Sequence, residues 1–187
     1  AQAGELMLYI GGVRVSVGAT LVDTQATLAT KLIAAINALP ADGGVVELQG
    51  YEYTISGAIA LTSGAFTLRG RTGTALKSSS TTANHITIGT VGGTYLYNVI
   101  IEQITFTRSS TCSAGYVIDL VNVGYSKFRD LRLFGDSKQY AGIRGRSVNT
   151  LTFERIRSEN IQKEHAYFAG IGASVGVTDG NVQNVVV

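Results

Sequence analysis

The sequence is poor in the residues that would support most alternatives to an all-β fold. Its 187 residues include one cysteine, one proline and no tryptophan, and only 15% of them are charged. Because Cys112 is the only cysteine, a disulfide framework is excluded and a cysteine-based zinc site is not expected. The low charge argues against a coiled coil or a solvated helical bundle, and the 45% hydrophobic content is too high for a disordered chain.

Long apolar runs and a strong charge of one sign are also missing. No stretch reaches about 18 consecutive apolar residues, so we expect no membrane insertion. The formal net charge is +2 and no nucleic-acid motif occurs, so we expect no nucleic-acid partner. Residues 1–4 lack the charged start of a signal peptide. What is present, β-branched residues and serine with 23 glycines, is typical of many short strands joined by turns.

Residues 1–44 are predicted to form an N-terminal unit of two strands and one helix. Alternating apolar residues predict strands over 6–10 and 13–17, joined by Gly11-Gly12. A helix is predicted from Asp23 or Thr24 to Leu39, before Pro40. Its apolar residues recur at helical spacing: Leu28, Leu32, Ile33, Ile36 and Leu39. We interpret this stripe as a face that packs on a core.

From residue 45 to 187 the sequence repeats itself. One series with the pattern apolar–polar–polar–apolar begins at Ile101, Phe128, Phe153 and Val182, at spacings of 27, 25 and 29 residues. A second series places isoleucines at 86, 118, 143 and 171, at spacings of 32, 25 and 28 residues. Two series that recur at similar spacings indicate stacked structural units, none of which can bury its apolar face alone. We predict an all-β fold, a right-handed single-stranded parallel β-helix, with an N-terminal strand–helix cap over its first coil.

This register also predicts columns of charge on the outer surface. One column would stack its members one coil apart, about 4.8 Å: Glu102, Arg129, Glu154 and Gln183. Asp119 would pair with Arg144 in the same way. Alternating signs favour such neighbours by about 0.2–1 kcal/mol for an exposed pair. Since the chain stops at Val187 inside an expected strand, we expect it to be truncated or its last coil to be covered by partner subunits.

The N-terminal third resembles a known family. Residues 23–77 resemble the start of the pectate-lyase-like β-helix of phage tailspikes and bacterial polysaccharide-degrading enzymes. The matching segments follow in order, namely a helix, a Gly-Gly strand, a Gly-Tyr strand, a strand ending in Leu-Arg-Gly and a final strand: residues 34–39, 43–48, 50–55, 59–70 and 73–77. The run of glycine and aspartate that usually precedes the helix is absent. Residues 4–39 look, over a shorter stretch, like Mu-like contractile-tail sheath subunits.

The resemblance implies a virion protein of a phage tail. Such spikes are usually homotrimers that bind or cleave the polysaccharide of the host surface, and they contact other tail proteins. A secreted bacterial polysaccharide lyase or glycoside hydrolase is the alternative from a different class. A purely structural tail component is the third. A trimer would have about three times the monomer mass, whereas most secreted lyases are monomers.

The acidic residues do not form a recognisable catalytic set. Glycoside hydrolysis needs two carboxylates about 5–9 Å apart, and a polysaccharide lyase needs a base with a cation beside it. None of the acids of the repeat region recurs at the spacing that would stack two of them on adjacent coils. Whether the chain is a depolymerase is therefore left open, with its catalytic residues unknown. No acid cluster suggests calcium, so no metal and no cofactor are expected.

Residues 125–163 are the richest in positive charge, with nine basic residues against four acids. Aromatic and histidine side chains lie among them at positions expected in loops or beside strands. We hypothesise a groove for an anionic polysaccharide, with arginine pairing with carboxylates as a planar fork. The candidate carbohydrate-binding residues are Tyr140, Arg144, Arg146, His165 and Tyr167. The alternative is a solvated basic surface without a ligand.

Overall fold

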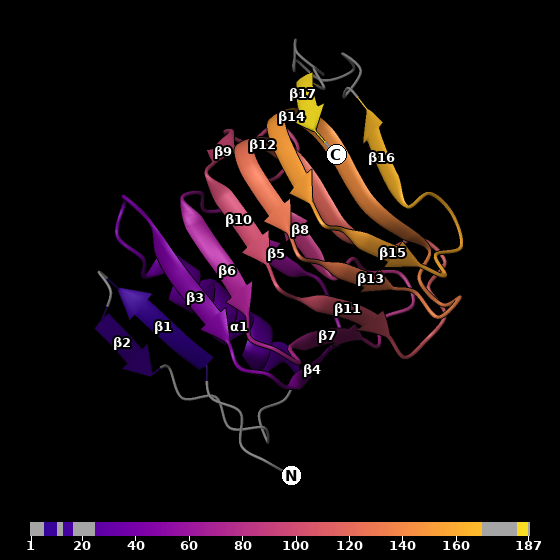
Figure 1. The fold of residues 1–187 in the computed structure, drawn as a ribbon, viewed down its shortest axis with the longest axis horizontal. Coiled ribbons are helices and arrows are strands. Elements are labelled where there is room, and N and C mark those ends of the chain that lie inside the picture. Colours follow the sequence, from indigo (N-terminus) through magenta and orange to yellow (C-terminus); the bar gives the residue numbers. More distant parts are fainter. Residues whose placement is uncertain (1–5, 11–12, 17–24, 170–182, 187) are drawn as a thin grey trace.

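The computed structural model describes residues 6–10, 13–16, 25–169 and 183–186. The chain is a parallel β-helix of about five coils, so the predicted fold class is confirmed. Each coil has three sides, and strands of successive coils pair in parallel on each side. Figure 1 shows the coils side by side, from the indigo N-terminal end to the yellow C-terminal end.

The first side carries the longest run of stacked strands. It consists of β3 (Gly44–Leu48), β6 (Phe66–Gly70), β9 (Leu96–Tyr97), β10 (Val99–Glu102), the C-terminal halves of β12 (Tyr116–Arg129) and β14 (Ala141–Glu154), and β17 (Gln183–Val186).

The second side is a sheet of five short strands. These are β4 (Glu52–Ile55), β7 (Ala75–Ser78), β11 (Thr105–Arg108), β13 (Arg132–Phe134) and β15 (Arg157–Glu159).

The third side completes each coil. It consists of β5 (Ile59–Leu61), β8 (Ile86–Ile88), the N-terminal halves of β12 and β14, and β16 (Ala166–Ala169). Two long strands, β12 and β14, thus run from the third side of one coil into the first side of the next. They bend at Asn122 and Ser147, which are buried and have positive φ angles of 55° each.

The core lies inside the coils and is built from columns of like residues. Ile86, Ile118 and Ile143 stack in register, as the repeat predicts, and Ile59 extends this column to the preceding coil. Phe128 and Phe153 stack with ring centroids 5.1 Å apart. Because side chains alternate along a strand, one side chain points into the core and the next faces outward. A buried side chain of this size stabilises the fold by about 1.5–3 kcal/mol.

The N-terminal elements cover the first coil in two ways. Helix α1 (Gln25–Asn37) is shorter than the predicted span and packs on β3, β4 and β5, with Leu32, Ala35 and Ile36 in the core. Strand β1 (Leu6–Ile10) pairs antiparallel with both β2 (Val13–Ser16) and β3. The backbone edge of the first coil is therefore covered by β1 and its core residues by α1, which together form the predicted strand–helix cap. The division of the chain at residue 44 stays a prediction.

Two details of the predicted register are wrong at the C-terminal end. Gln183 pairs with Asn149 and not with Glu154, because β17 is shifted along β14 relative to the predicted repeat. The position beside Ile143 is taken by Ala166, whereas Ile171 was expected there. Ile171 itself lies outside the described residues.

Candidate functional site

The predicted arginines of the third side gather around one buried carboxylate. Thr87, Asp119, Arg144 and Tyr167 occupy one column in successive coils, and Arg146 lies two residues after Arg144. Arg144 donates from Nε and Nη2 to the two oxygens of Asp119, at 2.8 and 2.7 Å. Arg146 donates from Nη2 to Asp119 Oδ2 at 2.9 Å. The predicted pairing of Asp119 with Arg144 is confirmed.

This cluster keeps an excess of positive charge. Burial alone would raise the pKa of Asp119, but hydrogen bonds and charge from Arg144 and Arg146 outweigh it and hold the pKa below its ordinary value. The bidentate bond to Asp119 raises the pKa of Arg144 in turn. One ionised carboxylate thus faces two guanidinium groups, which leaves a net charge of about +1. The Nε of Arg146 is buried and has no hydrogen-bond partner.

Two tyrosines complete this surface. The guanidinium carbon of Arg144 lies 4.1 Å from the centroid of the Tyr116 ring, a cation–π contact. The ring of Tyr140 meets Tyr116 edge to face, at 6.4 Å between centroids. We call Tyr116, Asp119, Tyr140, Arg144 and Arg146 the arginine surface. Tyr116 was not among the predicted site residues, although it lies three residues before Asp119 on the same strand.

The remaining two candidate residues, His165 and Tyr167, are not part of the arginine surface. The ring of His165 contacts Ser158 Oγ of the second side through Nδ1, at 2.7 Å, and its carbonyl accepts a hydrogen bond from the backbone of Ile143. His165 therefore does not join the arginine surface through its ring. Tyr167 takes the backbone position beside Arg144, and its side chain lies outside the described part of the structure.

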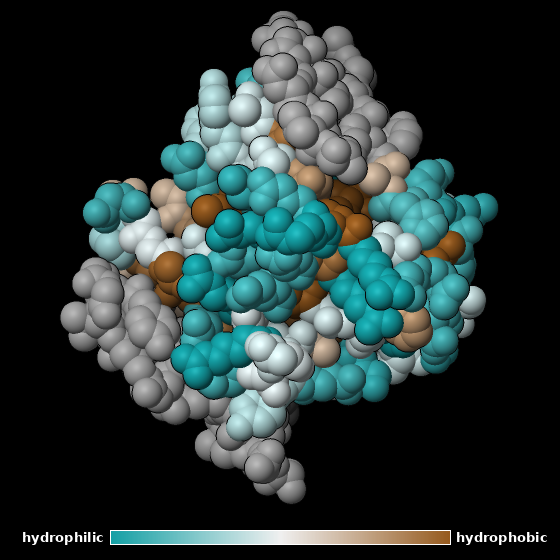
Figure 2. Space-filling model, in the orientation of Figure 1, coloured by the Kyte–Doolittle hydropathy of each residue, from teal (hydrophilic) through white to brown (hydrophobic). Residues whose placement is uncertain are grey.

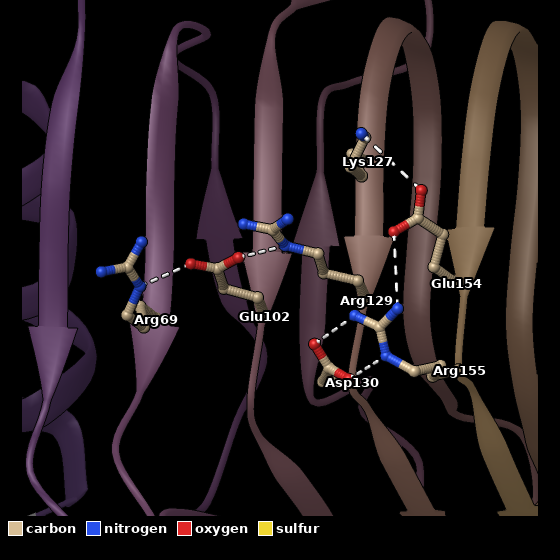
Figure 3. Close-up of polar contacts among 7 residues, drawn as sticks. All are labelled: Arg69, Glu102, Lys127, Arg129, Asp130, Glu154 and Arg155. Atoms are coloured by element: carbon tan, nitrogen blue, oxygen red, sulfur yellow. Dashed lines mark hydrogen bonds and ion pairs between the residues drawn. The ribbon is translucent and has the colours of Figure 1, made fainter.

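The first side carries a ladder of alternating charge, which confirms the predicted column from Glu102 to Glu154. Glu47, Arg69, Glu102, Arg129 and Glu154 occupy one register position in successive coils. Glu102 is 2% exposed and accepts hydrogen bonds from Nε of both neighbouring arginines. Figure 3 shows it between them.

Hydrogen bonds from arginine lower the pKa of two acids on this side, Glu102 of the ladder and Asp130 beside it. Burial would raise the pKa of Glu102, yet the hydrogen bonds from Arg69 and Arg129 hold it below its ordinary value. Figure 3 also shows Asp130 bound by both Nε and Nη2 of Arg155, and Arg155 lowers the pKa of Asp130. Because these charges are paired, the ladder is a stabilising feature. In Figure 2 this face is mainly hydrophilic, with smaller hydrophobic areas between the polar side chains.

Ion pairs neutralise most of the basic stretch at 125–163. Lys127, Arg129, Arg132, Lys138, Arg155 and Arg157 each have an acidic partner within 4.0 Å. Some of these acids come from other coils, so a count along the sequence overstates the free charge. Two arginines share one carboxylate at Asp119 and again at Glu159, where Arg132 and Arg157 meet, and of these two carboxylates only that of Asp119 is buried between its arginines.

A groove on the second side was not predicted. It has a volume of about 340 Å³ and crosses four coils. Its lining is polar apart from one aromatic ring: Glu52, Lys77, Thr107, Arg108, Ser109, Phe134, Asp136 and Lys138. Glu52 pairs with Lys77 at 3.0 Å and Asp136 with Lys138 at 2.8 Å. The hydroxyl of Thr107 is buried without a hydrogen-bond partner.

Behind this groove lies a buried polar network that holds two loops. Arg108, 3% exposed, donates to the carbonyls of Ser80 and Ala83 and to Oε1 of Gln139. His85 is buried beside it and its Nε2 lies 2.6 Å from the Thr107 carbonyl. Burial lowers the pKa of His85 to about 3, so the ring is neutral and its role is structural.

Cys112, the single cysteine, has the buried surroundings of a structural residue. The thiol is fully buried, and the backbone N–H of Gly115 lies 3.1 Å from its sulfur. Among the described residues, no group of three or more histidine, cysteine, aspartate or glutamate side chains could hold a metal ion. No helix in the described ranges is both long and apolar enough to cross a bilayer.

The fold and these surfaces define the chain as a parallel β-helix protein with an arginine- and tyrosine-bearing outer face. No family model matches the chain, and no curated protein matches its sequence. Among solved structures it is similar to ORF18 of Geobacillus virus E2, a phage protein, at 12% identity and a TM-score of 0.48. The similarity covers 97% of this chain and 52% of that one, so this chain spans about half of its length.

Proposed function

We propose that the chain is part of a phage tailspike or related tail protein and binds an acidic polysaccharide of the host surface. The observation that carries the binding proposal is the arginine surface, where one carboxylate faces two guanidinium groups beside two tyrosine rings. A guanidinium group offers paired N–H donors that match a sugar carboxylate. An aromatic ring offers an apolar face to the sugar ring.

The place of the chain in a virion rests on the sequence resemblance of residues 23–77 and 4–39. The same resemblance favours a homotrimer that contacts other tail proteins. Light scattering coupled to size exclusion tests this: a particle of about three times 19.7 kDa supports the trimer, and a monomer favours the alternative of a secreted lyase or hydrolase.

The binding proposal is tested by comparing two arginine variants. Arg146→Gln removes one donor from the arginine surface and leaves Arg144 to neutralise Asp119, so the fold is retained. Arg155→Gln removes an equally charged group whose partner is Asp130, outside that surface. We measure binding to a panel of purified acidic capsular and O-antigen polysaccharides, with polygalacturonate and neutral dextran alongside.

The expected result is that only the substitution at the arginine surface weakens binding. Arg146→Gln should weaken binding to the acidic ligand about tenfold, which corresponds to about 1.4 kcal/mol, and Arg155→Gln should leave it unchanged. Binding should also weaken as salt is raised, because the contact is between charges at the surface. Equal effects of the two variants would show that only net charge matters and would refute the site.

A further inference from the structure

A cluster of exposed aromatic side chains lies where the third side turns into the first side. Val91, Tyr97 and Tyr125 are 58%, 45% and 61% exposed, and they are the large apolar side chains that stand out as exposed in the described part of the chain. Tyr95 lies beside them. We call Tyr95, Tyr97 and Tyr125 the tyrosine corner. None of them was singled out by the sequence, because they lie beside the repeated strand positions.

The three rings form one continuous aromatic surface. Tyr95 and Tyr97 are stacked, with centroids 5.9 Å apart and ring planes at 16°. Tyr97 and Tyr125 are tilted by 50° at 5.8 Å, and they come from adjacent coils.

The corner is held rigidly from beneath. The side-chain amide of Asn122 is buried and donates to the carbonyls of Thr90 and Gly93, at 2.9 and 3.0 Å. These two bonds fix the loop that leads to Tyr95. The ring of Tyr97 lies over Gly124, where an added Cβ would be 3.0 Å from the ring. A binding surface that is ordered before it meets its ligand loses less entropy on binding.

Tyr125 adopts an unfavourable backbone conformation to present its ring. Its φ angle is 48°, in the left-handed region that a bulky side chain rarely occupies. Asn98 holds the equivalent position in the preceding coil with a φ of 59°, and asparagine tolerates this region well. Thr150 holds this position in the next coil with a φ of 52°, so the conformation belongs to the turn of each coil, and the chain places an aromatic ring on it at Tyr125.

The size of the corner and its neighbours indicate the class of partner. An aromatic side chain buries about 150–250 Å² when fully covered, so the exposed parts of these residues amount to roughly 300 Å². Each partner of a stable protein interface buries about 800 Å², so the corner by itself is too small to form such an interface. The Tyr95 hydroxyl lies 2.9 Å from Oγ of Ser147, the residue after Arg146. Since Ser147 is buried, this bond anchors Tyr95 on the strand that carries Arg144 and Arg146.

We infer that the tyrosine corner is a carbohydrate subsite that stacks on the faces of one or two sugar rings of the polysaccharide bound at the arginine surface. The inference rests on the proposed function and extends it. The C–H bonds on one face of a sugar ring are positively polarised and match the negative π face of a tyrosine. The arginine surface would select the acid groups, and the tyrosine corner would select a sugar chain over another polyanion.

Two substitutions separate binding from folding. Tyr125→Asn places at the corner the residue that already occupies this position one coil earlier, so the melting temperature should be unchanged or higher. Tyr97→Leu removes the central ring and keeps an apolar side chain over Gly124. Tyr97→Phe is the matched control, since it keeps the ring. The chain has nine tyrosines and no tryptophan, so tyrosine fluorescence reports directly on ligand stacking.

The probes are the acidic polysaccharide that the wild-type chain binds best in the panel above and polyacrylate, a polyanion without sugar rings. Tyr125→Asn and Tyr97→Leu should each weaken binding to the polysaccharide at least fivefold, with no change toward polyacrylate. Tyr97→Phe should bind like the wild-type chain, and the polysaccharide should alter the tyrosine fluorescence.

Unchanged polysaccharide affinity in Tyr125→Asn and Tyr97→Leu would overturn the subsite and leave the arginine surface standing. A change of oligomeric state in the same variants, with affinity retained, would assign the corner to contacts between copies and also overturn it. If the wild-type chain bound no polysaccharide of the panel, the proposed function itself would fail.

Discussion

Replacing Glu102 by glutamine should destabilise the protein markedly, because this carboxylate is the buried centre of the first-side ladder. Its side chain is 3% exposed, and it accepts hydrogen bonds from Arg69 and Arg129, which are 39% and 36% exposed. A hydrogen bond to a charged group contributes about 1.5–3 kcal/mol when buried. Since both arginines are partly in solvent, we discount the two bonds to a combined loss of about 2 kcal/mol.

This loss is measured by urea unfolding followed by circular dichroism. With a denaturant slope of about 1–3 kcal/mol per molar urea, the midpoint of Glu102→Gln should fall by about 1 M. Glu52→Gln is the matched control, since the Glu52–Lys77 pair also joins adjacent coils but is exposed. The control should lose no more than about 1 kcal/mol.

The effect should depend on pH in one direction. The pKa of Glu102 lies below its ordinary value of 4.5 in the folded chain, so its stabilisation is complete above that pH and is lost as pH falls through the folded-state value. The wild-type chain and Glu102→Gln should therefore differ at pH 7 and converge in acid. Equal midpoints at pH 7 would refute the assignment of the ladder as a stabilising feature.

Three further outcomes are expected. Arg108→Met should lower the free energy of unfolding by about 3 kcal/mol, because the carbonyls of Ser80 and Ala83 lose their donor. Backbone hydrogen exchange should become faster in residues 79–85. Unchanged exchange there would contradict the role of the buried polar network. Burial holds the pKa of His85 at about 3 in the folded chain, against an ordinary 6.5, so the unfolded chain takes up a proton first as pH falls. The stability of the wild-type chain should therefore fall from pH 6.5 to 5, and that of His85→Gln should fall less. Thermal melts in which the melting temperature of both chains depends equally on pH would contradict this. Gly89→Ala would place a Cβ 1.9 Å from the Val121 carbonyl oxygen at a φ of 81°, and should lower the free energy of unfolding by about 3 kcal/mol or more. In Gly57→Ala the added Cβ meets nothing within 4 Å, so this control should melt like the wild-type chain.

The sequence predicted the coils and their charged columns well because both follow from one repeated length. With strands that alternate between inside and outside, a constant coil length sets which residues become neighbours. That rule placed Glu102 beside Arg129, Arg129 beside Glu154, and Asp119 beside Arg144. It failed at Gln183, where the shift of β17 along β14 moves the strand out of the repeat.

Features formed between loops could not be predicted in the same way. The pairing of β1 with β3 is antiparallel and joins residues some forty positions apart, which leaves no local pattern. The second-side groove takes its lining from four coils, from Glu52 to Lys138. Tyr125 and its neighbours lie at a bend, where no period applies. Of the five predicted site residues, Tyr140, Arg144 and Arg146 come together, while the ring of His165 turns to Ser158.

The central claim, that the outer face of this β-helix binds an acidic polysaccharide, is tested most directly by one separation. The chain is incubated with a panel of host capsular and O-antigen polysaccharides, and the mixture is resolved by size exclusion with detection of both protein and sugar. We predict that at least one acidic polysaccharide co-elutes with the protein at low salt and separates from it at high salt. Elution of every polysaccharide apart from the protein, at unchanged size, would contradict the account and leave a purely structural tail component as the better description.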